Sequence, residues 1–306
     1  MSGRKGIKMK IRVKVPATTA NLGPGFDALG LALDLWNETL ITPANDFAVH
    51  VEGEGAGKLP SGRNNLIVRS AHRLAERAGQ SLPPFRAECV NRIPLTSGMG
   101  SSSAAVLTGL LVGNVLLGNP FSQDEILNLA CEIEGHPDNV ASALLGGLVV
   151  SVMENGRVMA RQIPVSAEIQ ITIALPNFYL PTKRARAALP KKVSMKNAVH
   201  NISRAILVTE ALRTGDLDWL ERAMDDKLHQ PYRLKLIPGA ASAMKAAREA
   251  GAKGVALSGA GPSVIAFSKT ETRIGESMKR AFEKVGLETR LFHLKVSSRG
   301  AETQVQ

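Results

Sequence analysis

The order of apolar and polar positions predicts strands and helices that alternate irregularly along the chain. Strands are expected at residues 8–16, 28–36, 39–52, 86–91, 146–153, 158–163, 169–175, 254–257, 264–267 and 288–294. Helices are expected at residues 66–78, 101–117, 123–132, 194–213, 217–228, 238–250 and 271–285. Because no strand–helix unit repeats, this pattern favours an α+β fold over a doubly wound parallel sheet.

Polar residues at the ends of these segments predict where two helices begin. Asn64 or Asn65 is placed to cap the helix at residues 66–78. Ser122 and Glu125 form a capping-box pattern before the helix at residues 123–132.

The chain has 306 residues, which is enough for about two domains. We expect the boundary near residues 155–166, so that an N-terminal domain covers residues 1–160 and a C-terminal domain covers residues 161–306. The residues after Ser297 follow no helical or strand pattern, and we expect a frayed tail there.

The composition excludes several classes of protein. Hydrophobic residues make up 44% of the chain and charged residues 21%, as in soluble globular domains. The longest apolar stretch, residues 104–117, is interrupted by Gly, Thr and Asn and is too short to span a bilayer. Cys89 and Cys131 are the only cysteines, so we expect no disulfide framework and favour a reducing, cytoplasmic location.

The net charge of +11 makes nucleic-acid binding an alternative to consider. One N-terminal segment carries much of this charge before the first acidic residue, in Arg4, Lys5, Lys8, Lys10, Arg12 and Lys14. We interpret the segment as a solvated arm that leads into an edge strand. Aromatic residues make up only 4% of the chain, which disfavours base stacking. Neither a nucleic acid nor a membrane is therefore expected as a partner.

A loop rich in Gly and Ser joins the expected strand at residues 86–91 to the helix at residues 101–117. Gly98 and Gly100 would let the backbone approach a ligand closely. The first amides of the helix would face an anion, and the hydroxyl groups of residues 101–103 would reach phosphate oxygens or a metal ion. The loop is neither a Walker A nor a Rossmann sequence. An ordinary Ser N-cap on a core helix is the alternative.

Three segments, in order along the chain, resemble the motifs of the GHMP kinases. The loop resembles the second motif with Pro94-Leu95-Thr96-Ser97-Gly98-Met99-Gly100-Ser101-Ser102-Ser103-Ala104. Residues 15–30 resemble the first motif, and residues 257–264 resemble the third. Within the family, the homoserine kinases are the most similar, through Glu134-Gly135-His136-Pro137-Asp138-Asn139-Val140. The resemblance extends over roughly residues 10 to 295.

The resemblance implies an N-terminal ribosomal-S5-like domain that binds ATP and a C-terminal ferredoxin-like domain. It implies ATP-dependent phosphorylation of L-homoserine to O-phospho-L-homoserine, in threonine biosynthesis, with Mg²⁺ and in a possible homodimer. The ATP-binding residues that it implies are Asn65, Pro94, Gly98, Met99, Gly100, Ser101, Ser102, Ser103 and Ala104. Ser102 and Glu134 would hold the metal ion, with Glu132 as the alternative to Glu134.

Homoserine offers an ammonium, a carboxylate and a hydroxyl group, and each needs its own partner. By resemblance, Asp27 would accept the ammonium group, and Asn21 would hold the hydroxyl group. Arg186 and Arg233, with Thr182 nearby, would bind the carboxylate, for which a guanidinium fork is suited. For both arginines, a solvated surface cation is the alternative.

His136, Asp138 and Asn139 precede a helix and are expected at the substrate end of the pocket. The expected catalytic residues are therefore Asn21, Asp27, Asp138 and Asn139. No general base is evident, because no Lys accompanies Asp27, and direct in-line transfer is the hypothesis. Another small-molecule kinase of the family, for mevalonate or shikimate, and a catalytically silent ligand-binding homologue stay open as alternatives. The third motif, at residues 258–263, is expected to pack against the phosphate loop.

Overall fold

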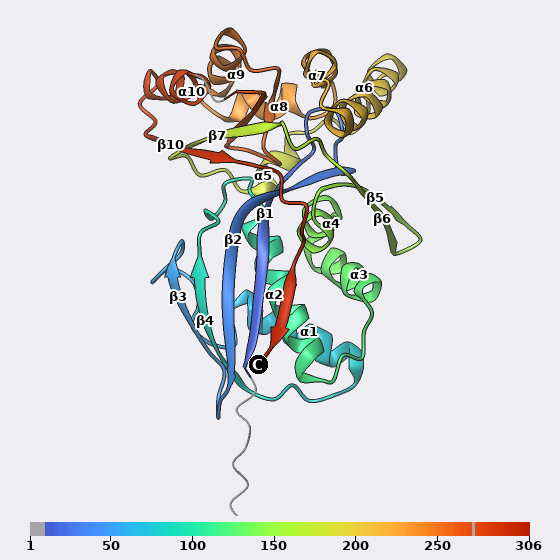
Figure 1. The fold of residues 1–306 in the computed structure, drawn as a ribbon, viewed down its shortest axis with the longest axis vertical. Coiled ribbons are helices and arrows are strands. Elements are labelled where there is room, and N and C mark those ends of the chain that lie inside the picture. Colours follow the sequence, from blue (N-terminus) through green and yellow to red (C-terminus); the bar gives the residue numbers. More distant parts are fainter. Residues whose placement is uncertain (1–9, 271–272) are drawn as a thin grey trace, which may run out of the picture.

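A seven-stranded sheet forms the larger half of the molecule in the computed structural model, which describes residues 10–270 and 273–306 (Figure 1). Its strands are β1 (Ile11–Ala20), β2 (Leu29–Pro43), β3 (Ala48–Gly53), β4 (Phe85–Asn91), β5 (Leu148–Glu154), β6 (Arg157–Ile163) and β11 (Glu302–Val305). The strands follow the order β11-β1-β2-β4-β3, and β5 pairs with β2 and with β6. Only β3 and β4 run parallel to each other.

Four helices cover one face of this sheet. They are α1 (Leu66–Ala78), α2 (Ser101–Leu116), α3 (Gln123–Glu134) and α4 (Asp138–Leu145). Asn65 caps α1 by accepting a hydrogen bond from the amide of Ile67, and Gly79 ends the helix in the left-handed conformation. The expected capping box of Ser122 and Glu125 is present at the start of α3.

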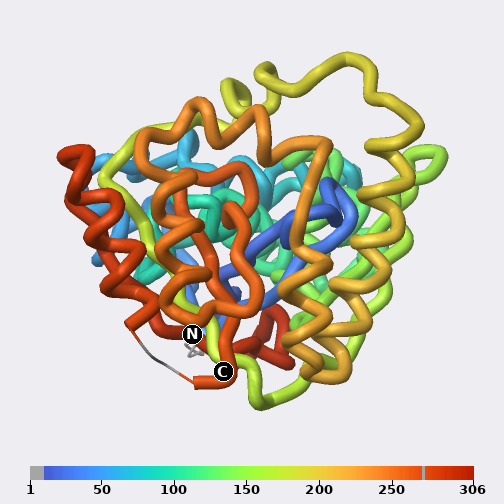
Figure 2. The backbone as a smooth tube through the Cα atoms, turned by 90° about the horizontal axis from the view of Figure 1, so that it is seen from above, coloured from blue at the N-terminus to red at the C-terminus, as the bar shows by residue number. Residues whose placement is uncertain are grey.

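A four-stranded antiparallel sheet forms the smaller half. Its order is β10 (Thr289–Leu294), β7 (Gln170–Pro176), β9 (Val264–Ser268) and β8 (Gly254–Leu257). The helices α9 (Ala240–Glu249) and α10 (Ile274–Glu283) pack against it and share its apolar core. The helices α6 (Met195–Thr214) and α7 (Leu217–Ala223) lie on the opposite side of this half (Figure 2). One mixed and one antiparallel sheet, each with its own helices, confirm the α+β class.

Two short helices next to the boundary between the sheets have no clear signal in the sequence. They are α5 (Thr182–Ala187) and α8 (Gln230–Arg233), which continues into a turn of 3₁₀ helix at Leu234–Leu236. The expected helix at residues 217–228 was too long, because it ends at Ala223. The carboxylate of Asp226 instead accepts the amides of Leu228, His229 and Gln230 and so caps the next turn.

The expectation of a frayed tail was wrong. Residues Glu302–Val305 form β11, which pairs antiparallel with β1, and the pairing continues between Lys10 and Gln306 with amide–carbonyl distances of 2.9 and 2.8 Å. For the same reason β1 is not an edge strand: β11 lies on one side of it and β2 on the other. Short strands with alternating polar residues are easily missed when their partner is far away in the sequence.

Three further expectations differ from the structure or are not tested by it. The strand expected at residues 39–52 is interrupted after Pro43, and β3 begins at Ala48. The first part of the basic arm and residues 271–272 of the last expected helix lie outside the described residues. The domain boundary after residue 160 stays a prediction. The first sheet itself continues to Ile163 and regains β11 after the second sheet is complete.

Candidate active site

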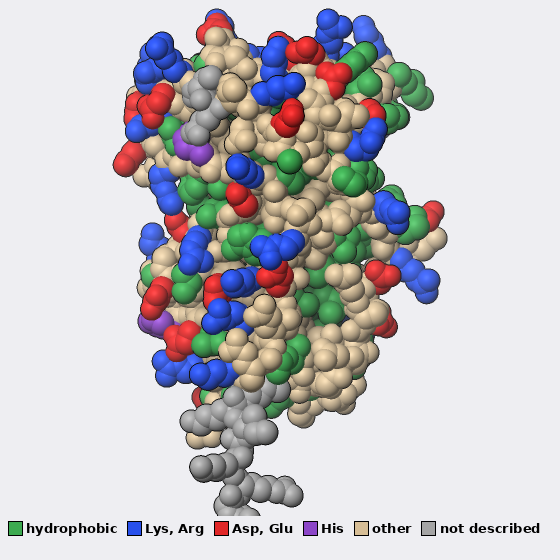
Figure 3. Space-filling model, in the orientation of Figure 1, with side chains coloured by type: hydrophobic (Ala, Val, Ile, Leu, Met, Phe, Trp, Pro, Cys, Tyr) green, Lys and Arg blue, Asp and Glu red, His purple; other side chains and the backbone are tan. Residues whose placement is uncertain are grey.

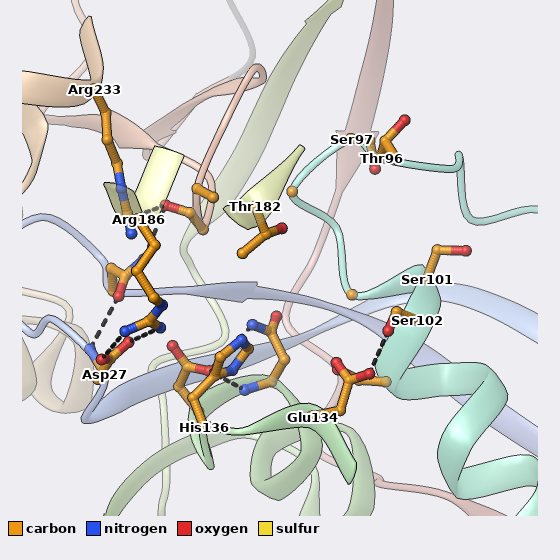
Figure 4. Close-up of a pocket in the computed structure, with 18 of the residues that line it drawn as sticks. Asp27, Thr96, Ser97, Ser101, Ser102, Glu134, His136, Thr182, Arg186 and Arg233 are labelled. Carbon is orange, nitrogen blue, oxygen red and sulfur yellow. Dashed lines mark hydrogen bonds and ion pairs between the residues drawn. The ribbon is translucent and has the colours of Figure 1, made fainter. Parts of the chain in front are cut away.

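A cavity of about 280 Å³ lies where the two sheets meet. Five segments bring polar side chains to it: the β1–β2 loop, the phosphate loop with the start of α2, the α3–α4 turn, α5, and α8 with Arg233. The third motif, between β8 and β9, adds Gly259 and Ala260. Figure 4 shows Asp27 and Arg186 on one side of the cavity and Ser102 and Glu134 on the other.

The backbone of the phosphate loop adopts, at its two glycines, a conformation that favours glycine. Gly98 and Gly100 have φ values of 79° and 74°, in the left-handed region. A Cβ atom on Gly98 would lie 2.2 Å from the carbonyl oxygen of Ser258. Gly100 occupies the N-cap of α2 and makes no side-chain capping bond. The alternative of an ordinary Ser N-cap is therefore wrong, and the first amides of α2 remain available to an anion.

The third motif holds the phosphate loop from the second sheet, as expected. The hydroxyl group of Ser258 donates to the carbonyl oxygen of Gly98 at 2.8 Å. The hydroxyl group of Ser263 donates to the carbonyl oxygen of Ser97 at 2.7 Å. These side chains are buried, so the bonds are shielded from water and fix the position of the loop.

Ser102 and Glu134 meet at the start of α2. The hydroxyl group of Ser102 donates to one carboxylate oxygen of Glu134, and that of Ser103 donates to the other at 2.9 Å (Figure 4). Glu132, the alternative metal ligand, instead pairs with Arg77 at 2.6 Å on the exposed side of α3. No three His, Cys, Asp or Glu side chains cluster as a metal site within the described residues.

Asp27 and Arg186 form a bidentate ion pair. Each guanidinium Nη atom lies 2.8 Å from one carboxylate oxygen of Asp27. Asp27 lies in the left-handed region at φ 54°, which turns its side chain towards the cavity. The ring of Phe26 lies 5.5 Å from the Arg186 guanidinium carbon and 5.2 Å from that of Arg233, within cation–π range.

Arg233 is buried, with only 1% of its surface exposed, so the alternative of a solvated cation is wrong for it. One Nη atom donates to Nδ1 of His229 and to the carbonyl oxygen of Gly259, each at 3.2 Å. Its Nε atom has no hydrogen-bond partner in the described part of the chain. Burial, and then the neighbouring charge of Arg186, lower the pKa of Arg233 to about 10. A buried cation with a spare donor is suited to an anionic ligand.

His229 and Asp226 support Arg233, although neither residue was expected in the site from the sequence. His229 donates from Nε2 to the carbonyl oxygen of Gly23 at 2.7 Å, which leaves Nδ1 to accept from Arg233. Burial lowers the pKa of His229 to about 4, so the ring is neutral at physiological pH. Asn201 on α6 donates to Asp226 at 2.7 Å and to the carbonyl oxygen of Pro24 at 3.1 Å.

The His136–Asn139 segment also faces the cavity. One carboxylate oxygen of Asp138 lies 3.0 Å from Nδ1 of His136, and it accepts the amide and the side-chain nitrogen of Asn139 at 2.7 and 3.2 Å. The bond to Asp138 raises the pKa of His136. Asn139 also accepts a bond from the hydroxyl group of Thr18 at 2.8 Å, which ties α4 to β1.

Asn21 and Thr182 line the cavity as well. The side chain of Asn21 donates to the carbonyl oxygen of Gly259 at 2.8 Å and accepts the amide of Asp27 at 3.0 Å. Asn21 therefore shapes the loop that carries Asp27, and one of its amide hydrogens has no acceptor among the described residues.

Four of the expected ATP-binding residues do not line this cavity: Asn65, which lines the second cavity described below, and Pro94, Met99 and Ala104. Met99 and Ala104 are buried, and the carbonyl oxygen of Met99 accepts the amide of Thr18 at 3.1 Å. Pro94 lies at a different pocket, on the far side of the loop. The remaining members of the set, residues 98 and 100–103, all line the cavity.

A second cavity, of about 320 Å³, meets the first at Thr96, Ser101 and Ser102. Its wall is mainly apolar, with side chains that include Val51, Leu59, Leu66, Leu95 and Ala105. Polar groups lie between them, in Asn37, Thr39, Asn64, Asn65, Asn91 and Thr108. Asn65 is expected here, but its side chain also caps α1 and donates to the carbonyl oxygen of Pro60 at 2.7 Å. Apart from Asn65, Ser101 and Ser102, the residues expected to bind ATP do not include those that line this cavity.

Comparison with known proteins gives consistent results. The model of the GHMP kinases N terminal domain matches residues 65–147, and that of the GHMP kinases C terminal domain matches residues 208–284. The chain is 45% identical to a homoserine kinase of Moorella thermoacetica, over 94% of this chain and 98% of that protein. It is 41% identical to one of Carboxydothermus hydrogenoformans, over 94% and 95%.

Solved structures with the same fold include a homoserine kinase from Cytophaga hutchinsonii. That structure has a TM-score of 0.85 and 32% sequence identity, and the match covers 99% of this chain and 100% of that one. A mevalonate kinase matches with a TM-score of 0.67 but only 15% identity, over 94% of this chain and 99% of that one, so it shows the fold alone.

Proposed function

Because the chain belongs to the GHMP kinase family and, within it, to the homoserine kinases, we propose how its site carries out ATP-dependent phosphorylation of L-homoserine. The product is O-phospho-L-homoserine, a step of threonine biosynthesis. One observation carries the assignment of the site: a carboxylate and two guanidinium groups face the same cavity as the phosphate loop. A kinase for a small amino acid needs both sets of groups within reach of each other.

The two connected cavities accommodate the two ends of ATP. The second cavity offers an apolar wall with a few amide and hydroxyl groups, which suits a nucleoside. The oligophosphate would then cross the start of α2 at Ser101 and Ser102, where both cavities meet. Unpaired amides and the positive end of the helix dipole favour an anion at this position.

Ser102 and Glu134 fit a Mg²⁺ ion. Both offer oxygen atoms, they are already in contact, and Mg²⁺ commonly takes one or two protein oxygens together with phosphate oxygens. When bound, the ion would neutralise charge that develops on the transferred phosphoryl group. Glu132 is turned away from the cavity and is not part of this proposal.

The amino acid would replace the ion pair between Asp27 and Arg186. Its ammonium group would take the place of the guanidinium group at Asp27, and its carboxylate would bind Arg186 and the spare donor of Arg233. Thr182 and Asn21 would contact the same ligand from α5 and from the first loop. This places the hydroxyl end of the substrate towards His136 and the phosphate loop.

We propose direct in-line transfer without a general base. One carboxylate oxygen of Asp138 already serves His136 and Asn139, and Asp27 is assigned to the ammonium group. Positioning and charge neutralisation supply most of the catalysis in phosphoryl transfer. The proton of the substrate hydroxyl group would leave to phosphate or to solvent.

No helix in residues 10–270 or 273–306 combines the length and the apolar character that crossing a bilayer requires. We propose the cytoplasm as the location, on the basis of two free thiols, Cys89 and Cys131. ATP and L-homoserine are the proposed partners, without nucleic acid or membrane, and the family suggests a homodimer.

The direct test measures ATP consumption by the purified protein with Mg²⁺ and L-homoserine, mevalonate, shikimate or no acceptor. We expect turnover with L-homoserine only. Turnover with mevalonate or shikimate alone would overturn the assignment of Asp27, Arg186 and Arg233. ATP binding without turnover on any acceptor would favour a silent homologue instead.

A further inference from the structure

We propose that Phe26 is a positioning residue, which holds the guanidinium groups of Arg186 and Arg233 for the carboxylate of the amino acid; this inference rests on the function proposed above. Phe26 lies in the β1–β2 loop and directly precedes Asp27. Its ring centroid lies 5.5 Å from the guanidinium carbon of Arg186 and 5.2 Å from that of Arg233. Figure 4 shows both arginines on the side of the cavity that holds Asp27. One aromatic ring is therefore within cation–π range of both guanidinium groups.

Arg233 is a buried charge without a carboxylate partner among the described residues. Its hydrogen bonds go to Nδ1 of His229 and to the carbonyl oxygen of Gly259, which are both neutral acceptors. Figure 3 shows the more common arrangement, in which Lys and Arg side chains stand on the outside of the molecule with acidic side chains among them. A buried charge without such compensation is unfavourable. The face of the Phe26 ring reduces this cost, because its electrons attract a cation.

The ring stabilises the guanidinium groups without occupying their hydrogen-bond donors. The five donors of a guanidinium group lie in its plane, whereas an aromatic ring attracts the positive charge as a whole. A carboxylate in the place of Phe26 would also compensate the charge, but it would take the donors that the substrate needs. The Nε atom of Arg233 has no partner in the described part of the chain. Phe26 therefore holds the arginines in place and leaves them able to bind a carboxylate.

Phe26 can position the arginines because its own ring is fixed at the start of α8. The ring stacks on that of His229, with centroids 5.2 Å apart and an angle of 26° between the planes. Nε2 of His229 also donates to the carbonyl oxygen of Gly23, in the same loop as Phe26, at 2.7 Å. When the amino acid separates Asp27 from Arg186, the ring remains as a fixed surface along which Arg186 passes to the new carboxylate.

The first experiment measures steady-state kinetics of Phe26→Leu, which keeps an apolar side chain but removes the ring. We expect the KM for L-homoserine to rise about 3- to 30-fold, while the KM for ATP changes by less than about twofold. Phe26→Tyr keeps the ring and should retain the low KM. Phe292→Leu is the matched control, because it removes a ring that lies 5.1 Å from the guanidinium carbon of Arg290, outside the cavity, and both KM values should stay unchanged. An unchanged KM in Phe26→Leu, or equal rises in Phe26→Leu and Phe26→Tyr, would overturn the proposal.

The second experiment uses two competitive inhibitors to separate this role from a general effect on the loop. L-2-Aminobutyrate has the ammonium and carboxylate groups of homoserine, whereas 3-aminopropan-1-ol has the ammonium and hydroxyl groups. In Phe26→Leu, we expect the inhibition constant of L-2-aminobutyrate to rise by the same factor as the KM, because its carboxylate binds the arginines. The inhibition constant of 3-aminopropan-1-ol should stay the same. Equal rises for both inhibitors would show that Phe26 only shapes the loop around Asp27, contrary to the proposal.

Urea unfolding gives a measurement that needs no substrate. In a double-mutant cycle of Phe26→Leu and Arg186→Met, we expect the double variant to lose less stability than the sum of the two single variants. Additive losses would show that ring and guanidinium group do not stabilise each other. A wild-type protein that does not use L-homoserine would overturn the proposed function and the carboxylate ligand with it. Wild-type turnover of L-homoserine that Phe26→Leu leaves unchanged would overturn this inference alone.

Discussion

Asp27 and Arg186 neutralise each other across the boundary between the two sheets, through two bonds of 2.8 Å. The proposed function assigns them to opposite ends of the amino acid. A zwitterionic substrate can separate the pair and give each residue a new partner: its ammonium group pairs with Asp27, and its carboxylate pairs with Arg186. A substrate with only one charge would leave the other member of the pair without its partner, so the charge-assisted bonds that Asp27 and Arg186 now make to each other would be only half replaced.

This relationship predicts discrimination by charge. 4-Hydroxybutyrate keeps the hydroxyl and carboxylate groups of homoserine but lacks the ammonium group. A charge-assisted hydrogen bond contributes about 1.5–3 kcal/mol, so we expect kcat/KM to fall about 10- to 100-fold or more. Steady-state kinetics with both acceptors gives the comparison. Similar kcat/KM values for the two acceptors would show that Asp27 does not bind the ammonium group.

Asp27→Asn removes the proposed partner of the ammonium group and frees Arg186. We expect the KM for L-homoserine to rise about 10- to 100-fold, with a smaller change in kcat, because an interaction made in both ground and transition state is lost. The KM for ATP serves as the internal control and should change little. A large fall in kcat at constant KM would identify Asp27 as a base.

Asp138→Asn tests the absence of a general base. We expect kcat to fall by about tenfold or less, because the amide can still accept bonds from Asn139. A general base contributes 10²- to 10⁴-fold, so a loss of about that size at constant KM would show that Asp138 removes the hydroxyl proton. Circular dichroism of the variant checks that α4 is retained.

Glu134→Gln and Glu132→Gln distinguish the two acids at the end of α3. For Glu134→Gln we expect the Mg²⁺ concentration at half-maximal activity to rise by about tenfold or more, since an anionic oxygen ligand is lost. Glu132→Gln changes the same residue type on the same helix and removes only the exposed pair with Arg77, so we expect no such shift. The opposite ranking would assign the metal ion to Glu132.

Gly98→Ala tests the contact between the phosphate loop and the third motif. Gly118→Ala is the control, because Gly118 also has a positive φ, 83°, but no atom lies within 4 Å of a Cβ placed there. The control should lower the free energy of unfolding by about 1 kcal/mol, the cost of a left-handed side chain. Gly98→Ala should lower it by about 3 kcal/mol or more, because its Cβ meets Ser258. Chemical denaturation measures both, and equal losses would contradict the packing.

The lowered pKa of His229 predicts that the free energy of unfolding falls when the solution is acidified. Its pKa is about 4 in the folded protein, against 6.5 as a reference, so between these pH values the unfolded chain binds a proton that the folded chain does not. The stabilisation is complete above pH 6.5 and is lost as the pH falls towards 4, by up to about 1.4 kcal/mol per pH unit. Urea unfolding at several pH values should show a shallower dependence in His229→Gln. An identical dependence in both proteins would show that His229 does not contribute.

Local signals in the sequence were enough for the elements and loops that depend on neighbouring residues. Asn65 and Ser122 cap helices within three residues of themselves, and the phosphate loop needs glycine at Gly98 and Gly100 for its own backbone. The same pattern argument failed for β11, which pairs with β1 at the other end of the chain. A four-residue polar segment has little preference for a strand until such a partner is present.

The burial of the site residues and the shape of the cavities were harder to predict from the sequence than the identity of the residues. Arg233 could be named from its motif, but its burial depends on His229 and Gly259, which reach it only in the folded protein. Apart from the phosphate loop and the start of α2, the second cavity is built from strands, a loop and the start of α1, which are distant in sequence and carry no motif. Residue types at fixed spacing are visible in a sequence, whereas desolvation and cavity shape are products of tertiary packing.

The pairing of β11 with β1 also has a consequence for folding on the ribosome. While the chain is being synthesised, β1 and β2 emerge early, but the strand that covers the other edge of β1 leaves the ribosome only after the whole second sheet. Until then β1 presents unpaired amides and carbonyls to any other strand. A nascent chain stalled before Glu302 would therefore carry a nearly complete catalytic half with an open, aggregation-prone edge.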